Sequence, residues 1–215
     1  MELAQKIDPK HSAVIVVDVQ NDFCHPDGIG AKVGGHSHIA MHQEMAPNLV
    51  RFIAQARQAQ VPIIFIRTIH NKWTESEALI ESHRLSGREY QPKCWGDGWG
   101  SEFYGDVRPQ AEDCIVVKHR HSAFVATDLD LILRCQRIKT IVLTGLNTNI
   151  CVQATGRDGF MLDYHVVYVS DCCATSGGWE KHEEALKSFC SYAEVRTSNE
   201  LATVWQKTLS LPAAS

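Results

Sequence analysis

Short apolar runs recur along the chain, and longer amphipathic segments separate them. The first run, residues 12–17, reads S-A-V-I-V-V, and such continuous apolar character is typical of a strand buried on both faces of a parallel sheet. Five later runs contain β-branched or aromatic residues and predict further strands. These runs cover residues 62–68, 114–118, 140–143, 165–169 and 193–197.

Helical periodicity fills most of the segments between these runs. Apolar residues recur at helical spacing from Leu49 to Ala56, and Pro47 suits a first turn, so we expect a helix over residues 47–60. Similar patterns predict helices over residues 127–137, 152–161, 179–189 and 198–208. Strands that alternate with helices predict one α/β domain over residues 1–215, with a doubly wound, mostly parallel six-stranded sheet and helices on both faces.

One long segment, residues 69–109, does not follow this alternation. It contains three of the five tryptophans and the glycine-rich sequence C-W-G-D-G-W-G. A connection of this length commonly covers a site. We therefore expect residues 69–109 to be a lid or an oligomer-contact insertion.

Composition and charge limit the partners of the protein. The formal net charge of -4 at pH 7 provides no basic face for nucleic acid. The N-terminal residues lack the apolar core of a signal peptide, and no run approaches the ~18 apolar residues that cross a bilayer. The eight cysteines lack C-x-x-C spacing, which indicates free thiols in a reducing compartment. We expect a cytoplasmic protein that binds a small molecule and neither nucleic acid nor a membrane.

Three predicted strands end close to groups capable of acid–base or nucleophilic chemistry. Asp18 follows the first strand, Lys118 ends the third, and Cys151 lies between the fourth strand and a helix. Because the carboxyl ends of parallel strands share one edge of a sheet, these three residues should lie close together. The free N–H groups and dipole at a helix N-terminus favour a thiolate and, later, an oxyanion, so Cys151 is expected to have a lowered pKa.

This trio permits the cleavage of an acyl compound. The Cys151 thiolate can attack an acyl carbon, the Asp18 carboxylate can move the proton, and the Lys118 ammonium can hold both in their charged forms. Taken one at a time, the residues have plainer interpretations. These are a buried structural cysteine, a turn-forming aspartate and a solvated lysine.

The same segments carry a family resemblance. V-V-D-V-Q-N-D-F at residues 16–23, the stretch at residues 118–134 that begins K-H-R-H-S-A-F, and T-G-L-N-T-N-I-C-V-Q-A-T-G-R-D-G at residues 144–159 resemble the isochorismatase-like cysteine hydrolase family. The likeness covers roughly residues 12–198. It is particularly close to amidohydrolase members, such as ureidoacrylate, biuret and N-carbamoylsarcosine amidohydrolases.

The resemblance implies specific roles for residues of the site. The catalytic triad of the family falls on Asp18, Lys118 and Cys151. A non-proline cis peptide is implied between Asn147 and Thr148, and the backbone N–H groups of Asn147 and Cys151 are implied to form an oxyanion hole. Many relatives have a small residue at the position of Asn147, so this side chain is expected to shape the pocket.

Seven residues are candidates for binding the substrate. Arg67 and Arg120 could pair with a carboxylate, and the aromatic residues could form an apolar wall. Salt bridges, core packing and subunit contacts are the alternative roles for such residues. The candidates are Phe23, Arg67, His70, Trp95, Trp99, Arg120 and Phe124.

No metal or other cofactor is expected. Nicotinamidase-like members of the family bind a metal through an Asp-x-His pair after the second strand, whereas this chain reads R-T-I-H at residues 67–70. His36, His38 and His42 could be imagined as ligands, but histidines in a polar loop are more often surface residues than a zinc or iron site.

Together these features predict a cysteine-dependent hydrolase of a small amide, ureide or carbamoyl compound. The reaction would cleave a C–N bond through a thioester and release ammonia or an amine. An isochorismatase-type hydrolase of an ester or vinyl ether is one alternative, and a catalytically silent small-molecule-binding protein on the same fold is another. We also expect a homo-oligomer, either a dimer or a tetramer.

Overall fold

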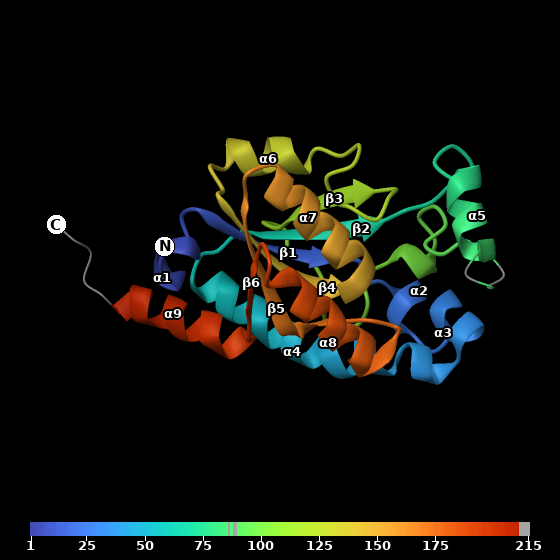
Figure 1. The fold of residues 1–215 in the computed structure, drawn as a ribbon, viewed down its shortest axis with the longest axis horizontal. Helices are drawn as coiled ribbons and strands as arrows, with labels where there is room; N and C mark the ends of the chain where they lie inside the picture. The colour runs from blue at the N-terminus through green and yellow to red at the C-terminus, as the bar shows by residue number, and fades with distance from the viewer. Residues whose placement is uncertain (86, 88–89, 211–215) are drawn as a thin grey trace.

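The computed structural model describes residues 1–85, 87 and 90–210, and a six-stranded sheet lies at its centre (Figure 1). The strand order is β3-β2-β1-β4-β5-β6, and every neighbouring pair is parallel. This confirms the predicted α/β fold with a parallel sheet. The strands are β1 (Ser12–Val17), β2 (Ile63–Thr68), β3 (Cys114–Lys118), β4 (Thr140–Leu146), β5 (His165–Ala174) and β6 (Glu194–Arg196).

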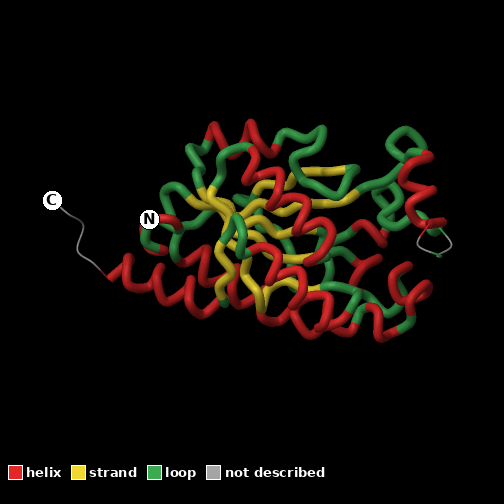
Figure 2. The backbone as a smooth tube through the Cα atoms, viewed as in Figure 1, coloured by secondary structure: helices red, strands yellow, loops and turns green. Residues whose placement is uncertain are grey.

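Helices cover both faces of this sheet, and Figure 2 shows the strands in yellow between helices in red. The helices α4 (Ala40–Gln58) and α9 (Ser198–Ser210) pack on one face, where Val14 and Val16 of β1 point. The opposite face receives Ala13, Ile15 and Val17 of β1. It is covered by α6 (Leu129–Cys135), α7 (Gln153–Met161) and α8 (Gly178–Phe189). All six residues of β1 are therefore buried, which explains its unbroken apolar sequence.

The remaining helices are short, and most of them gather at the carboxyl end of the sheet. They are α1 (Leu3–Lys6), α2 (Asn21–Cys24), α3 (Ile29–Gly34) and α5 (Glu77–Leu85). Figure 1 shows α2, α3 and α5 beyond the arrowheads of β1 and β2, at the opposite end of the molecule from the N-terminus. This edge of the sheet is where a ligand binds in an open α/β fold.

Helix α4 differs from the prediction, because it begins at Ala40 and contains Pro47 in its interior. The segment ahead of the proline has its own buried residues, Met41 and Met45, which join the core under this face of the sheet. Their packing extends the helix through a residue that normally marks a helix start.

Strand β5 is also longer than predicted, because it continues through Asp171 to Ala174. The Asp171 carboxylate does not end the strand, since its two oxygens accept hydrogen bonds from Ser198 N at 2.7 Å and Ser198 Oγ at 2.6 Å. A carboxylate satisfied in this way can stay within a partly buried strand.

None of the helices in the described part of the chain combines the length and the apolar character that crossing a membrane requires.

Trp205 provides a test of how α9 stabilises the fold. Its side chain is 1% exposed, stacks on Phe52 of α4 with ring centroids 5.4 Å apart, and donates from Nε1 to Ile7 O at 2.9 Å. We expect Trp205→Ala to lower the free energy of unfolding by about 3–5 kcal/mol, because it removes a large buried ring. Urea denaturation followed by circular dichroism measures this change.

Trp73→Ala is the matched control, because the Trp73 side chain is 84% exposed. The control should change the free energy of unfolding by no more than about 0.5 kcal/mol. A similar, small change in both variants would show that α9 contributes little to the stability of the fold.

Candidate active site

The structure brings Asp18, Lys118 and Cys151 together at the carboxyl edge of the sheet. Asp18 Oδ2 and Lys118 Nζ form an ion pair at 2.8 Å, and their side chains are 2% and 1% exposed. The Cys151 thiol interacts with both charged groups. Asp18 leaves β1 with φ of 55°, a backbone conformation that non-glycine residues seldom adopt outside turns and functional sites.

Neighbouring groups hold this ion pair in place. Thr68, the last residue of β2, donates from Oγ1 to Asp18 Oδ1 at 2.7 Å. Lys118 Nζ donates to Arg120 O at 2.9 Å. Asp18 Oδ2 is buried and makes no hydrogen bond of regular geometry, so it retains a lone pair that can accept a proton. Because unpaired buried charges are strongly unfavourable, each ion depends on the other.

The charge state of Cys151 differs from the one expected. Burial raises the pKa of Cys151 to about 12; Lys118 acts to lower this pKa, whereas Asp18 raises it further. Burial also acts to lower the pKa of Lys118, but the interactions with Asp18 and Cys151 together raise it, and the net shift is upward. At neutral pH the free protein therefore holds a neutral thiol beside a charged pair. The expectation of a thiolate took account of the helix end but not of the desolvation of the sulfur.

Near the end of β4, ahead of Cys151, the backbone at Gly145 lies very close to the backbone of β1. Gly145 has φ of 97°, and a Cβ atom at this position would lie 2.2 Å from Val17 O of β1. Only glycine fits here. Residues Thr148–Val152 then form a π-helix that contains Cys151.

The cis peptide lies one bond earlier than the resemblance implied. It joins Leu146 to Asn147, not Asn147 to Thr148. After this bond, Val152 N donates to Asn147 O at 3.1 Å and closes a π-type turn.

Two polar side chains ahead of Cys151 make hydrogen bonds with α8 and with the segment between β5 and α8. Thr148 Oγ1 lies 2.8 Å from His182 Nδ1, and the His182 imidazole also makes a hydrogen bond with the backbone of Ser170. Burial lowers the pKa of His182, so the ring is neutral at neutral pH and Nδ1 can accept from Thr148. Asn147 Oδ1 accepts from Ser176 N at 3.0 Å. These contacts fix the backbone that carries Cys151.

A small cavity of about 180 Å³ opens over the three residues. Three of the seven predicted substrate-binding residues line it, namely Phe23, His70 and Arg120. The segment of residues 69–109 contributes several further residues to the lining of the cavity. These include Leu79, His83, Tyr90, Gln91 and Lys93.

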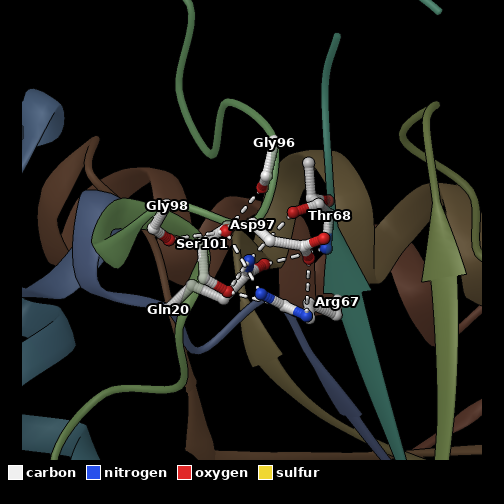
Figure 3. Close-up of polar contacts among 7 residues, drawn as sticks. All are labelled: Gln20, Arg67, Thr68, Gly96, Asp97, Gly98 and Ser101. Carbon is white, nitrogen blue, oxygen red and sulfur yellow. Dashed lines mark hydrogen bonds and ion pairs between the residues drawn. The ribbon is translucent and has the colours of Figure 1, made fainter.

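Arg67 lies outside the cavity, which corrects its assignment as a substrate-binding residue. Its guanidinium is occupied by the protein, with Nε donating to Ser101 O at 2.9 Å and Nη1 paired with Asp97 at 3.3 Å (Figure 3). Gln20 joins the same network, since its Nε2 donates to Thr68 O at 2.9 Å and to Ser101 O at 2.8 Å. The network fixes Thr68, the residue that binds Asp18.

Trp95, Trp99 and Phe124 also lie outside the cavity, contrary to the prediction. The two tryptophans are 44% and 46% exposed, and Trp99 meets the edge of His25 with ring centroids 4.9 Å apart. Phe124 stacks on Tyr164 at 5.8 Å and packs against the core beneath α6 and α7. Residue type predicts an apolar wall here, whereas the direction of each aromatic side chain depends on tertiary contacts that the sequence does not display.

Sequence reasoning missed His121, which lies next to Cys151. His121 Nδ1 is 3.6 Å from Cys151 Sγ, and the imidazole lines the cavity. No periodicity in the sequence indicates this position, because residues 119–121 form bends after β3 and not an extended strand.

The loop histidines have separate environments. His36 is exposed, whereas His38 lines the cavity. His42 is 1% exposed, its Nδ1 lies 2.8 Å from Phe23 O, and burial lowers its pKa. In the part of the chain that the structure describes, no group of three or more His, Cys, Asp or Glu residues is arranged to hold a metal ion.

Comparisons with known proteins agree with the fold and the motifs. The family model of the isochorismatase domain matches residues 12–200. A ureidoacrylate amidohydrolase from Acinetobacter baylyi is 29% identical over 199 residues, which cover 85% of this chain and 78% of the relative.

Two solved structures are similar over most of their length. A cysteine hydrolase from Pseudomonas syringae pv. phaseolicola has a TM-score of 0.79 at 28% identity, covering 94% of this chain and 95% of that chain. An N-carbamoylsarcosine amidase from Thermoplasma acidophilum has a TM-score of 0.69 at 26% identity, covering 88% of this chain and 97% of that chain.

The raised pKa of Cys151 predicts how the thiol reacts with an alkylating reagent. Because the thiolate is the reactive form, the alkylation of Cys151 by iodoacetamide should accelerate about tenfold per pH unit from neutral pH upward. Cys135 and Cys190 are exposed and should react first, so the experiment uses a Cys135→Ser/Cys190→Ser variant. Peptide mass spectrometry follows the rate, and a rate already level near neutral pH would reveal a thiolate in the free protein.

Proposed function

The chain belongs to the isochorismatase domain family, and we propose that it is a cysteine-dependent hydrolase of a small amide, ureide or carbamoyl compound. The observation that supports this proposal is the buried Asp18–Lys118 ion pair beside the Cys151 thiol, at the base of a cavity. The names of two similar proteins, ureidoacrylate amidohydrolase and N-carbamoylsarcosine amidase, favour the amide and ureide classes.

The first half of the proposed reaction forms a thioester. Asp18 Oδ2 accepts the thiol proton as Cys151 Sγ bonds to the carbonyl carbon, and Lys118 stabilises the negative charge on the sulfur. The backbone N–H groups of Asn147 and Cys151 are proposed to donate to the developing oxyanion. Asp18 then gives its proton to the leaving nitrogen, and the C–N bond breaks. Ammonia or an amine leaves, and the acyl group stays on Cys151.

The arrangement of the acid favours amides over activated esters. An amine is a poor leaving group unless its nitrogen is protonated, and Asp18 holds a proton next to the sulfur after the attack. Amide resonance also makes the carbonyl carbon weakly electrophilic, so stabilisation of the oxyanion matters. The loss of one such donor typically costs about 3–4 kcal/mol of transition-state stabilisation. These requirements match a buried carboxyl group beside the nucleophile.

The cavity suggests the size and charge of the substrate. A volume of about 180 Å³ is smaller than the ~300 Å³ at which drug-sized sites begin. Lys118 pairs with Asp18, and Lys93 and Arg120 are two further basic residues that line the wall. The Lys93 ammonium lies 5.6 Å from the centroid of the Phe23 ring. We propose a small polar acyl compound that carries an anionic group.

We propose that residues of the 69–109 segment form the cover of this cavity. The backbone of the segment is joined to the catalytic edge, since Arg120 Nη1 donates to Thr74 O at 2.8 Å and His70 N donates to Cys94 O at 2.9 Å. Cys94 N in turn donates to Asp22 Oδ2 at 2.6 Å. These bonds hold Lys93, the neighbour of Cys94, against the cavity.

Ammonia release tests the proposed function. With a panel of primary amides, ureides and carbamoyl compounds, the protein should release ammonia from at least one compound. Cys151→Ser and Asp18→Asn should each lower kcat by at least about a thousandfold, and the double variant should be no slower than the slower single variant, because the residues act as a unit.

Cys135→Ser is the matched control, since Cys135 is an exposed thiol on α6 and should leave kcat unchanged. Circular dichroism confirms that each variant is folded. Turnover of an ester or of isochorismate without ammonia from any amide would contradict the amidase proposal.

The charge of the substrate has its own test. Lys93→Gln should raise KM about 10- to 100-fold for an amide that carries a carboxylate, because a hydrogen bond to a charged group is worth about 1.5–3 kcal/mol. The KM for a neutral amide of similar size should change little. Lys32→Gln on α3 is the control, because Lys32 is exposed and does not line the cavity. Equal effects of Lys93→Gln on both substrates would show that Lys93 does not recognise charge.

A further inference from the structure

His121 lies beside Cys151 in the cavity that the ion pair also lines. It follows Lys118 by three residues, and its Nδ1 atom is 3.6 Å from Cys151 Sγ. The residue is exposed to solvent and lines the cavity, whereas Asp18 and Lys118 are almost completely buried. Cys151 is therefore next to both a buried acid–base group and a solvent-accessible imidazole.

The two groups are suited to different steps. Asp18 Oδ1 accepts from Thr68, and Oδ2 pairs with Lys118, so both carboxylate oxygens already have partners within the protein. A water molecule that attacks an acyl group on Cys151 has to enter from the solvent side of the cavity. His121 is positioned on this side, within reach of the sulfur and of a group attached to it.

We propose that His121 is the catalytic base for hydrolysis of the acyl-enzyme, a role that rests on the proposed function because it requires a thioester on Cys151. The imidazole takes a proton from water as the water oxygen bonds to the acyl carbon. The tetrahedral intermediate then collapses, the C–S bond breaks, and the Cys151 sulfur leaves with the electron pair. The proton on His121 passes to the sulfur, which restores the neutral thiol and releases the acid product.

The charges around His121 support this role. Partial desolvation of the ring lowers the pKa of His121, and the nearby Lys118, His83 and Arg120 lower it further, whereas Asp18 acts in the opposite direction. The net shift is downward, so the ring is neutral at neutral pH and can accept a proton. As the pH falls through the pKa of His121, the ring becomes protonated and deacylation should slow.

An activated ester isolates the step at which His121 acts. p-Nitrophenyl acetate acetylates a cysteine without needing an acid for its leaving group, so a burst of p-nitrophenolate measures acylation and the steady state measures deacylation. His121→Gln keeps a hydrogen-bonding side chain but cannot accept a proton. The variant should give a full burst, within about threefold of the wild-type rate, and a steady state lowered about 100-fold.

Three further readouts accompany the kinetics. Intact-mass analysis of His121→Gln during the steady state should find one acetyl group on Cys151. Hydroxylamine, a nucleophile that does not depend on a base, should restore the turnover of the variant. The fall of the wild-type deacylation rate at low pH should be absent in His121→Gln. His165→Gln is the matched control, because His165 is an exposed histidine at the start of β5, and it should behave as the wild type.

The possible results separate the inference from the proposed function. Wild-type deacylation in His121→Gln would overturn the role of His121 while leaving the cysteine mechanism intact. An equal loss of burst rate and steady-state rate would show that His121 positions Cys151 and is not the base for water. If the wild-type protein gives no burst and no acetyl adduct, Cys151 is not an acyl acceptor, and the proposed function fails together with the inference.

Discussion

The buried ion pair between Asp18 and Lys118 is the interaction on which the site depends. Two charges that are 2% and 1% exposed can coexist with a hydrophobic core only because they lie 2.8 Å apart and have further polar partners. Their meeting requires Lys118 to reach from β3 across β2 to the end of β1. The same pair then surrounds Cys151 with a proton acceptor and a cation. Stability and the proposed chemistry therefore share the same atoms.

The parallel sheet could be predicted from local sequence, because its buried strands have a distinctive hydrophobic pattern. Strands buried on both faces are unbroken apolar runs, and the polar residue after each run marks the edge where ligands bind. Asp18, Lys118 and Cys151 were selected by this rule, and the structure places them together. The start of α4 could not be predicted in the same way, because Met41 and Met45 pack against the core and extend the helix on the N-terminal side of Pro47. Tertiary packing overrode a local signal there.

The rest of the site depends on contacts between distant segments. The sequence suggests that Arg67 could bind a substrate carboxylate, but in the structure its guanidinium donates to Ser101, which lies thirty-four residues later. The raised pKa of Cys151 follows from desolvation, which the helix position alone does not disclose. His121 becomes a candidate only when the segment after β3 is folded against the π-helix. Side-chain direction and burial decided each of these cases, and neither is encoded in a single segment.

Rapid-quench mass spectrometry of the wild-type protein with a turned-over amide tests the central claim most directly. Samples quenched within the first turnover and digested should contain the acyl part of the substrate on the peptide with Cys151, and its appearance should match the release of ammonia in rate and amount. This result would establish that the thiol beside the Asp18–Lys118 pair is the nucleophile. Ammonia released at the full rate with no adduct on Cys151, or with an adduct on another residue, would contradict the account.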